Sequence, residues 1–256
     1  MSKKIASGAK KLVIDVKVGT GALIKNIKDA TKLAKLMQTI GKSHNIEVTC
    51  LITNMDIPLG KNIGNALEVE EAINTLKGNG PSDLLEVVIT LCSIIIGAVK
   101  KIPNNEAKNL LFKQLNNGEA YKKFEELVTA QNGDINSIKI SDKVFSIKSD
   151  KSGYINKINA LRLGELAKQI GAGRNTLEDK IDYEVGLVLT KKVGDYVEKE
   201  EEILKVYLKD KDVSDLAKDE KKGIFKNVKS LVMYKFGSVI LNGTDNIIIS
   251  KLLGIA

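Results

Sequence analysis

The spacing of hydrophobic residues near the start of the chain predicts a strand, a helix and a second strand. Residues 11–18 and 46–53 are short and rich in β-branched side chains, as buried strands are. Between them, apolar residues recur every three or four positions over residues 27–40, which is typical of one face of an amphipathic helix. This order indicates a βαβ unit with parallel strands. Ligands of such sheets gather beyond the carboxyl ends of the strands, here residues 18–22 and 54–60.

The pattern along the rest of the chain predicts a helical section and then a strand-rich one. Turn signals separate four helices, and from about residue 138 apolar and polar residues alternate as in strands, with one further helix among them. We therefore expect an α/β lobe with a partial parallel or mixed sheet, followed by a strand-rich α+β lobe. The expected helices are 66–76, 81–99, 104–115, 118–131 and 160–170, and the strands are 144–148, 153–158, 183–189 and 203–208.

Composition narrows the class of protein. The chain has 256 residues, of which 43% are hydrophobic, and this is enough for a substantial core. Its longest apolar run, residues 84–99, contains Glu86 and Thr90 and falls short of the roughly 20 residues of a membrane span, so no membrane role is expected. The net charge of +8 comes from dispersed lysines, and aromatic residues are only 4%, so few bases could stack on the protein. We expect no nucleic-acid partner.

The cysteines and the histidine give no sign of a metal or redox site. Cys50 and Cys92 each lie inside an apolar run without a second thiol nearby, as buried free thiols of a reducing cytoplasm would. His44 lies at a helix-to-strand junction without an acidic or cysteine partner in local register. We expect a cytoplasmic protein with His44 in a surface turn.

Four loops could bind a ligand or an ion, and each also has a purely structural explanation. Gly19-Thr-Gly21 could approach a phosphate, although it lacks the third glycine of GxGxxG. The loop 59–72 has acidic residues at a helix start, which suits either the helix dipole or a cation held by carbonyls and one carboxylate. Arg174 could hold a phosphate, or more simply pair with Asp179 or Asp182. Residues 193–204 resemble half of a biotinyl-type barrel without its modified lysine.

Three motifs in order resemble the pyrimidine-nucleoside phosphorylase and thymidine phosphorylase family. They are MSKKIASGAKKLVIDVKVGTGA, LITNMDIPLGKNIGNALEVEEAINTLKG and GAGRNTLEDKIDYEVGLVLTKKVGDYV, and together they span almost the whole chain. The resemblance implies phosphorolysis of pyrimidine nucleosides such as uridine, thymidine and deoxyuridine, with inorganic phosphate as co-substrate. It also implies a homodimer, and three parts of the chain: a hinge remnant at 1–8, a central lobe at 9–137 and a C-terminal lobe at 138–256 with a barrel-sandwich character.

The same resemblance implies roles for individual residues. Lys3 would hydrogen-bond the pyrimidine ring, where a mobile point charge can stabilise the departing anionic base. A monovalent cation such as K⁺ would be held by the backbone carbonyls of Leu59 and Asn62 and the carboxylate of Glu71. The family's phosphate loop and its other base-binding residues would lie upstream of Met1. We therefore expect a C-terminal portion with little or no activity alone.

Other functions stay open at this stage. The chain could be a non-catalytic assembly module that joins a fragment encoded upstream. It could instead be a related enzyme such as an AMP phosphorylase, whereas the strand-rich C-terminal lobe argues against an anthranilate phosphoribosyltransferase.

Overall fold

The computed structural model describes residues 1–209, 232–235 and 247–248. These residues form two compact units whose segments alternate along the chain. The first unit contains residues 1–56 and 81–120 with a strand from the C-terminal segment, and the second contains residues 57–80 and 121–241. The mixed α/β class expected from the sequence is confirmed. The expected borders at residues 8 and 137 stay predictions about family domains.

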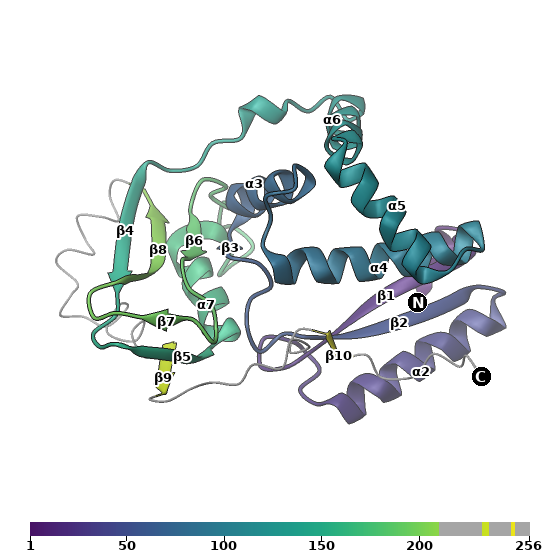
Figure 1. Cartoon of the computed structure of the whole chain (residues 1–256), viewed down its shortest axis with the longest axis horizontal. Helices are drawn as coiled ribbons and strands as arrows, with labels where there is room; N and C mark the ends of the chain where they lie inside the picture. Colours follow the sequence, from purple (N-terminus) through teal and green to yellow (C-terminus); the bar gives the residue numbers. More distant parts are fainter. Residues whose placement is uncertain (210–231, 236–246, 249–256) are drawn as a thin grey trace. The chain divides into compact units, whose positions relative to one another are not determined.

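A parallel strand pair forms the centre of the first unit. Strands β1 (Lys11–Val18) and β2 (Glu47–Asn54) pair in register from Lys11↔Glu47 to Val18↔Asn54 (Figure 1). Strand β10 (Ile247–Ile248) adds to the other edge of β2 in antiparallel orientation. The βαβ prediction is therefore correct, including its parallel pairing.

Helix α2 (Ile27–Ser43) connects the two strands and covers one face of the sheet. It begins at Asn26, whose side chain accepts a hydrogen bond from the backbone N–H of Asp29 at 2.9 Å, which satisfies an otherwise unpaired donor. Its apolar face packs on the sheet around Ala30 and Ile52, which are 0% and 1% exposed. Burying a side chain such as Ile52 contributes roughly 1.5–3 kcal/mol.

The other helices of the first unit are α1 (Ser2–Ala6), α4 (Ser82–Lys100) and α5 (Asn104–Asn116). Helix α4 lies against β1 and α5, on the face of the sheet opposite α2 (Figure 1). By length and composition, α4 is also the one helix of the described residues that could cross a membrane. It is one continuous helix of 19 residues that includes Glu86 and Thr90, and it is displaced by one residue from the expected helix at 81–99.

The second unit contains two small sheets. The first has the order β3-β6-β8-β4, in which every pair is antiparallel, and the second has the order β7-β5-β9. Side chains of these strands and of one helix form a single buried cluster that includes Ile155, Leu163 and Val206. The strands are β3 (Asn62–Ile63), β4 (Lys143–Lys148), β5 (Gly153–Ile158), β6 (Gly186–Leu189), β7 (Tyr196–Val197), β8 (Glu202–Leu208) and β9 (Val232–Lys235).

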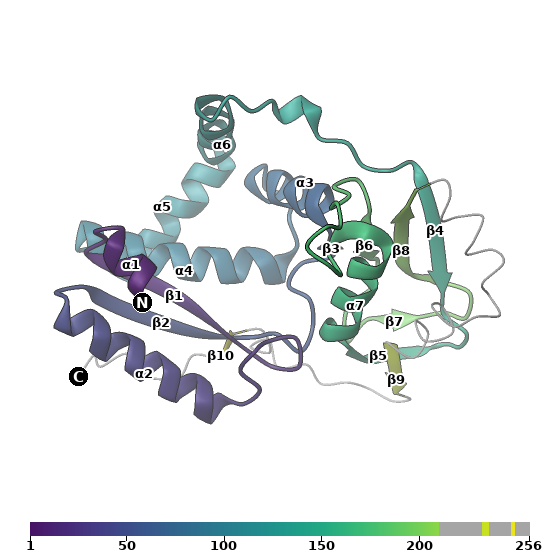
Figure 2. The ribbon, with the colours of Figure 1, turned by 180° about the vertical axis from the view of Figure 1, so that it is seen from behind.

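Three α-helices accompany these sheets. Helix α3 (Asn65–Leu76) follows β3 directly, α6 (Glu119–Ala130) precedes β4, and α7 (Ala160–Ala167) follows β5, as the reverse view shows (Figure 2). Helix α7 ends earlier than expected, because a π-turn over Lys168–Ala172 contains Gly171 with a φ of 104°. A short 3₁₀ turn, Ile135–Ser137, lies between α6 and β4.

Two glycines allow β3 to approach β6 closely enough to start α3. A Cβ at Gly186 would lie 2.5 Å from the carbonyl oxygen of Ile63. A Cβ at Gly64 would lie 2.7 Å from the carbonyl oxygen of Val185, and Gly64 has a φ of 143°. A side chain at either position would push the two strands apart. This contact fixes the first turn of α3 beside the loop that precedes β3.

Candidate functional site

The loop before β3 folds around a buried carboxylate of α3. Glu71 is 8% exposed, and its Oε1 accepts hydrogen bonds from the backbone N–H groups of Lys61 at 2.8 Å and Asn62 at 3.2 Å. Gly60 packs directly on this carboxylate: a Cβ there would lie 2.2 Å from Glu71 Oε2, and its φ is +71°. The loop is therefore shaped by an anion at its centre.

A lysine from another part of the second unit supplies a cation to the same loop. The Nζ atom of Lys192 donates to the carbonyl oxygens of Pro58 at 2.7 Å and Gly60 at 2.5 Å. The backbone N–H of Lys192 donates to Asp195 Oδ2 at 2.7 Å, and this bond holds the turn that aims the side chain. Two carbonyls of the loop thus converge on one positive charge.

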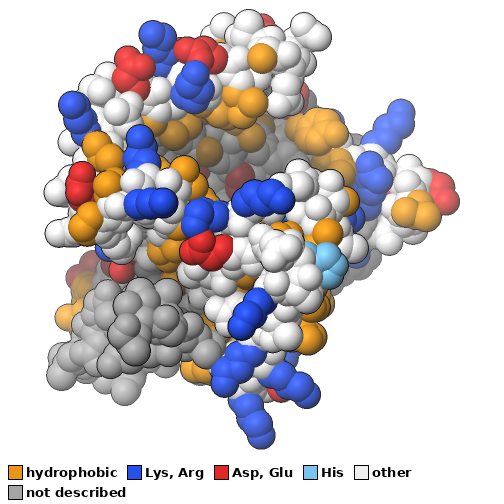
Figure 3. All heavy atoms as spheres, turned by 90° about the vertical axis from the view of Figure 1, so that its right-hand side faces the viewer, with side chains coloured by type: hydrophobic (Ala, Val, Ile, Leu, Met, Phe, Trp, Pro, Cys, Tyr) orange, Lys and Arg blue, Asp and Glu red, His pale blue; other side chains and the backbone are white. Residues whose placement is uncertain are grey.

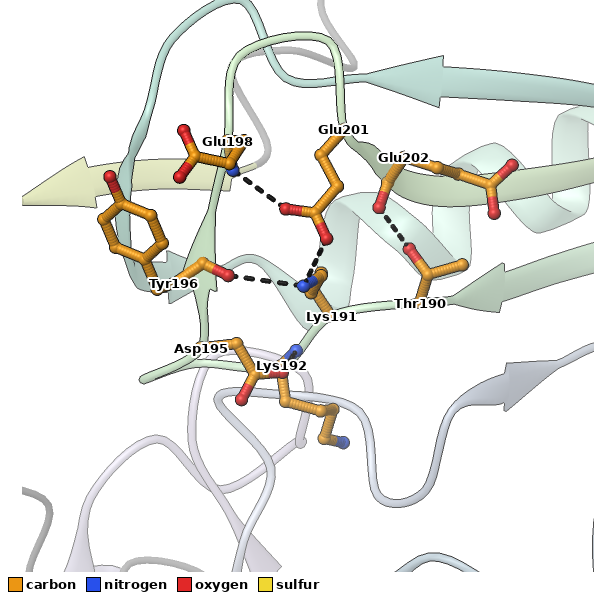
Figure 4. A network of polar contacts seen from close by, with 8 residues as sticks. All are labelled: Thr190, Lys191, Lys192, Asp195, Tyr196, Glu198, Glu201 and Glu202. Atoms are coloured by element: carbon orange, nitrogen blue, oxygen red, sulfur yellow. Dashed lines mark hydrogen bonds and ion pairs between the residues drawn. The ribbon is translucent and has the colours of Figure 1, made fainter.

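Figure 4 shows how the two neighbouring lysines of this turn differ. Lys191 Nζ lies between the carboxylate of Glu201, at 2.6 Å, and the carbonyl of Tyr196, at 3.3 Å. The hydrogen bond from Lys191, followed by one from the backbone N–H of Glu198, lowers the pKa of Glu201. The side chain of Lys192 extends away from this network, toward the loop at residues 58–60. Lys191 therefore serves the local turn, whereas Lys192 joins the turn to the loop around Glu71.

The acidic residues at the start of α3 separate into two roles. Glu68 is exposed and its Oε1 accepts a hydrogen bond from Gly64 N at 3.1 Å, as expected for a carboxylate that caps a helix start. Glu71 is buried and is bonded to the loop instead. Asn62 adds a side-chain bond to the carbonyl of Leu67 at 2.8 Å. The structure thus brings together Asn62 and Glu71, but through the backbone N–H of Asn62 and not through the carbonyl expected to bind a cation. The cation ligand set of Leu59, Asn62 and Glu71 stays a prediction.

The oxygen atoms of this loop are of the type that binds hard cations. Carbonyls and a single carboxylate suit a weakly bound monovalent or hard divalent ion. Within the described residues, no group of three or more His, Cys, Asp or Glu side chains could hold a metal ion. Any cation here would depend mainly on backbone carbonyls, so its affinity would depend on the shape of the loop.

The glycine loop after β1 is occupied by its own bonds. Gly21 N donates to Met55 O at 2.9 Å, and Thr20 N donates to Asp56 Oδ1 at 2.7 Å. Gly19 N donates to Ile24 O at 3.0 Å. The carboxyl ends of the two strands do meet, as expected for a parallel pair, but the donors that would cradle a phosphate are already bonded. The structural interpretation of this loop is therefore favoured.

Lys3 lies in the short helix α1 and its side chain is exposed. Lys4, its neighbour in the same helix, is exposed as well. Lys3 belongs to the first unit, whereas the loop around Glu71 belongs to the second. The base-binding role of Lys3 stays a prediction.

The expected ion pair of Arg174 is not formed among the described residues. Asp182 pairs with Lys209 at 2.5 Å, and Asp179 accepts bonds from Thr176 and from Asn175 N, which lower its pKa. Local backbone donors outcompete a long flexible side chain here. The ion pair between Lys209 and Asp182 could not be predicted from the sequence, because these side chains come close only when β6 pairs with β8.

A polar cluster on the sheet of the first unit was missed by the sequence analysis. Thr53 is fully buried, and its hydroxyl donates to Asp15 Oδ1 at 2.5 Å. Lys17 Nζ bonds both Asp15 Oδ2 at 2.8 Å and Thr53 Oγ1 at 2.9 Å. The sequence contained a signal for this cluster, since Asp15 and Lys17 lie two positions apart on one face of a strand whose other face is apolar.

The structure also shows the surroundings of the two cysteines and of the histidine. Cys50 and Cys92 are free, and partial burial raises the pKa of both thiols. A raised pKa disfavours the reactive thiolate. His44 is exposed at the end of α2, where its Nδ1 lies 3.0 Å from Ile40 O. On the face drawn in Figure 3, basic side chains are interspersed with acidic and apolar ones.

Two parts of the chain match known protein families. Residues 1–121 match the family described as glycosyl transferase family, a/b domain, and residues 154–225 match the pyrimidine nucleoside phosphorylase C-terminal domain. The chain is 44% identical over 223 residues to the pyrimidine-nucleoside phosphorylase of Staphylococcus epidermidis, covering 84% of this chain and 52% of that protein. It is 43% identical over 225 residues to the enzyme of the same name from Staphylococcus aureus, covering 85% and 52%.

The chain thus spans about half the length of the curated relatives it matches. The two family matches lie in the order expected from the sequence motifs and cover parts of both structural units. Together with the level of identity, they show that the chain belongs to the pyrimidine-nucleoside phosphorylase family.

Proposed function

We propose that this chain contributes to the phosphorolysis of pyrimidine nucleosides, with uridine, thymidine and deoxyuridine as substrates. Inorganic phosphate would attack the sugar, and the products would be the free base and a (deoxy)ribose 1-phosphate. The observation that carries the proposal is the match to both domains of the family, in order, by a chain 44% identical to an enzyme of that name.

The chemistry assigns a role to Lys3. As the glycosidic bond breaks, the sugar becomes cationic and the base leaves with negative charge, so a positive charge at the base lowers the barrier. In this proposal Lys3 would supply that charge; its exposure on a short helix supports the role, since its ammonium group is flexible.

A monovalent cation such as K⁺ would act on the loop rather than on the substrate. The carbonyls of Leu59 and Asn62 and the carboxylate of Glu71 would hold it. Support comes from the burial of Glu71 and from the neighbouring carbonyls of Pro58 and Gly60, which already converge on a positive charge. Such an ion would fix the loop between β2 and α3.

The whole enzyme would be a cytoplasmic homodimer in which this chain forms about half of each subunit. The phosphate site would lie in the half of the relatives that the chain does not span. Alone, the chain would therefore show little or no turnover. A role as an assembly module, or activity on AMP, remain alternatives that one experiment separates.

The experiment measures phosphate-dependent release of uracil or thymine by ultraviolet absorbance. The chain is assayed alone and after coexpression with the non-matching half of the Staphylococcus epidermidis enzyme, with AMP as a further substrate. We expect release only from the assembled form, and a loss of about 10²-fold or more in kcat/KM for Lys3→Gln. Lys4→Gln, in the same exposed helix, is the matched control and should be nearly neutral.

Each outcome decides between the alternatives. Turnover by the chain alone at the rate of an intact enzyme would refute the half-site proposal. An assembled form that releases no base would leave only the assembly role. A preference for AMP would replace the substrate class.

A further inference from the structure

Lysines form a row along the exposed face of helix α2 in the first unit. Lys28, Lys32, Lys35 and Lys42 are all exposed, and their spacing of four, three and seven residues places them on one face of the helix. At a rise of about 1.5 Å per residue, the row is about 21 Å long. Lys25, just before the helix, is exposed as well. These five residues are called the lysine row.

The opposite face of α2 holds the helix on the sheet. Ala30 and Ala34 are both fully buried, and Leu33 and Met37 pack against the same hydrophobic cluster. Figure 1 shows α2 on one face of the strand pair β1 and β2. The apolar face of the helix is therefore already occupied, and the lysine row is the surface that α2 offers to a partner.

No described residue forms an ion pair with the lysine row. Asp29, the single acidic residue of α2, accepts a hydrogen bond from Asn26 Nδ2 at 2.8 Å at the start of the helix. Glu47, at the start of β2, pairs with Lys11 instead. The ammonium of Lys25 donates to a backbone carbonyl at 2.9 Å, which leaves its charge in place. Within the described part of the chain, the row therefore presents five positive charges that no carboxylate neutralises.

We propose that the lysine row binds the surface of an anionic lipid bilayer, with α2 lying flat on the headgroups. A straight helix meets a plane along its whole length, so every lysine of the row reaches the charged surface at once. Clusters of four to eight basic residues on one helix are typical of binding to anionic headgroups. Because the apolar face of α2 stays on the sheet, the contact is electrostatic and involves no insertion. The expectation of no membrane role concerned a span, which a surface contact does not need.

A nucleic acid fits the same charges less well. Helix α2 contains no aromatic residue on which a base could stack, and no arginine, the residue that grips phosphate groups with two donors. Ile27 and Leu36 lie on either side of the lysine row and are 47% and 55% exposed. Aliphatic side chains gain from contact with a headgroup region, whereas binding to a phosphate backbone relies on charge. The surroundings of the row therefore favour lipid headgroups.

The test measures sedimentation of the full chain with lipid vesicles. Vesicles of equal parts phosphatidylglycerol and phosphatidylcholine are compared with vesicles of phosphatidylcholine alone, at low and at high KCl. The double variant Lys32→Gln/Lys35→Gln removes two charges from the middle of the row, and glutamine keeps the helix propensity close to that of lysine. The matched control, Lys113→Gln/Lys122→Gln, removes two exposed lysines from α5 and α6, so it lowers the net charge of +8 by the same amount.

We expect the chain to bind only the anionic vesicles. Binding should weaken as salt is added, because the screening length is about 10 Å at 0.1 M salt and shortens above it. The row variant should bind about 20-fold or more weakly, since each lysine near such a surface contributes about fivefold in affinity. The control variant should stay within about twofold of the unmodified chain. Circular dichroism of each variant shows that it is folded.

Three results would overturn the proposal. The chain could fail to sediment with the anionic vesicles. Equal losses for the two double variants would assign the binding to net charge and not to the row. Tighter binding to duplex DNA than to vesicles at equal phosphate concentration, lost in the row variant, would assign the row to a nucleic acid. The lipid contact is independent of the proposed reaction, because vesicle binding uses neither nucleoside nor inorganic phosphate.

Discussion

The hydrogen bonds from Lys192 to the loop around Glu71 allow the loss of unfolding free energy on their removal to be predicted. Replacing Lys192 by Met keeps most of the side-chain volume but removes the ammonium that donates to the carbonyls of Pro58 and Gly60. Hydrogen bonds to a charged group contribute about 1.5–3 kcal/mol each. Because Lys192 is half-exposed, we take a combined loss near the low end, about 2 kcal/mol. For a chain of this size, such a loss lowers Tm by about 4–8 °C.

The same substitution tests the affinity of the loop for external cations. Without the lysine, two carbonyls and the Glu71 carboxylate remain as oxygen ligands for a monovalent ion. An ion at ten times its Kd would stabilise the folded state by about 1.4 kcal/mol. We therefore expect K⁺ to raise the Tm of Lys192→Met more than that of the unmodified chain. Choline chloride at the same concentration controls for ionic strength.

Lys191→Met is the matched control. Lys191 is the adjacent residue and is similarly half-buried, but its ammonium bonds Glu201 and the carbonyl of Tyr196 instead of the loop. Solvent screens an ion pair with an exposed carboxylate such as Glu201, so we expect a smaller loss from Lys191→Met than from Lys192→Met. Thermal unfolding of the three proteins is followed by circular dichroism in KCl and in choline chloride. Equal losses for the two variants, or equal responses to both salts, would refute the assignment of Lys192 to this loop.

Two further predictions concern a glycine and an aspartate. Gly60→Ala should destabilise the fold by about 2–4 kcal/mol, because its Cβ would meet the Glu71 carboxylate and its φ is positive. The control is Gly78→Ala, which has a φ of +85° and open space around it, so it should show only the backbone cost of about 1 kcal/mol. Equal losses of Tm for the two variants would contradict this prediction. The bonds from Thr176 and Asn175 lower the pKa of Asp179, so the stability they give is present above the pKa of an ordinary aspartate and is lost as the pH falls through the lowered pKa. Asp179→Asn should therefore reduce unfolding stability at pH 7 and make it less sensitive to acid between pH 5 and pH 2, which urea titrations at several pH values would show; parallel pH profiles would disprove it.

The elements that follow from local periodicity could be predicted from the sequence. Strand β1 is found at the expected residues 11–18, and β2 is displaced by one residue from the expected 46–53. Helices α2 to α6 begin within one residue of their expected starts, because amphipathic spacing and Pro or Asn signals are local properties of the chain. The carboxyl ends of the two strands also meet as expected.

The contacts that build the candidate site could be predicted only in part. Glu71 was identified through the resemblance, but its burial and its two backbone donors depend on how the loop closes. Lys192 was missed, because 132 residues separate it from Gly60 and only the pairing of β3 with β6 brings them together. Arg174 was assigned a partner from proximity in sequence, and Lys209 pairs with Asp182 instead through β8. Long-range partners follow from topology and not from local spacing.

The alternation of the two units along the chain has a consequence for how such a gene can change. Residues 57–80 are inserted between two segments of the first unit, and residues 81–120 lie between two segments of the second. No single crossover between two related genes can therefore exchange one unit and leave the other whole. Recombination that succeeds must either carry both units together or use four breakpoints, near residues 56, 80, 120 and 241. We expect the two units to be inherited as a block, with their sequences diverging in step.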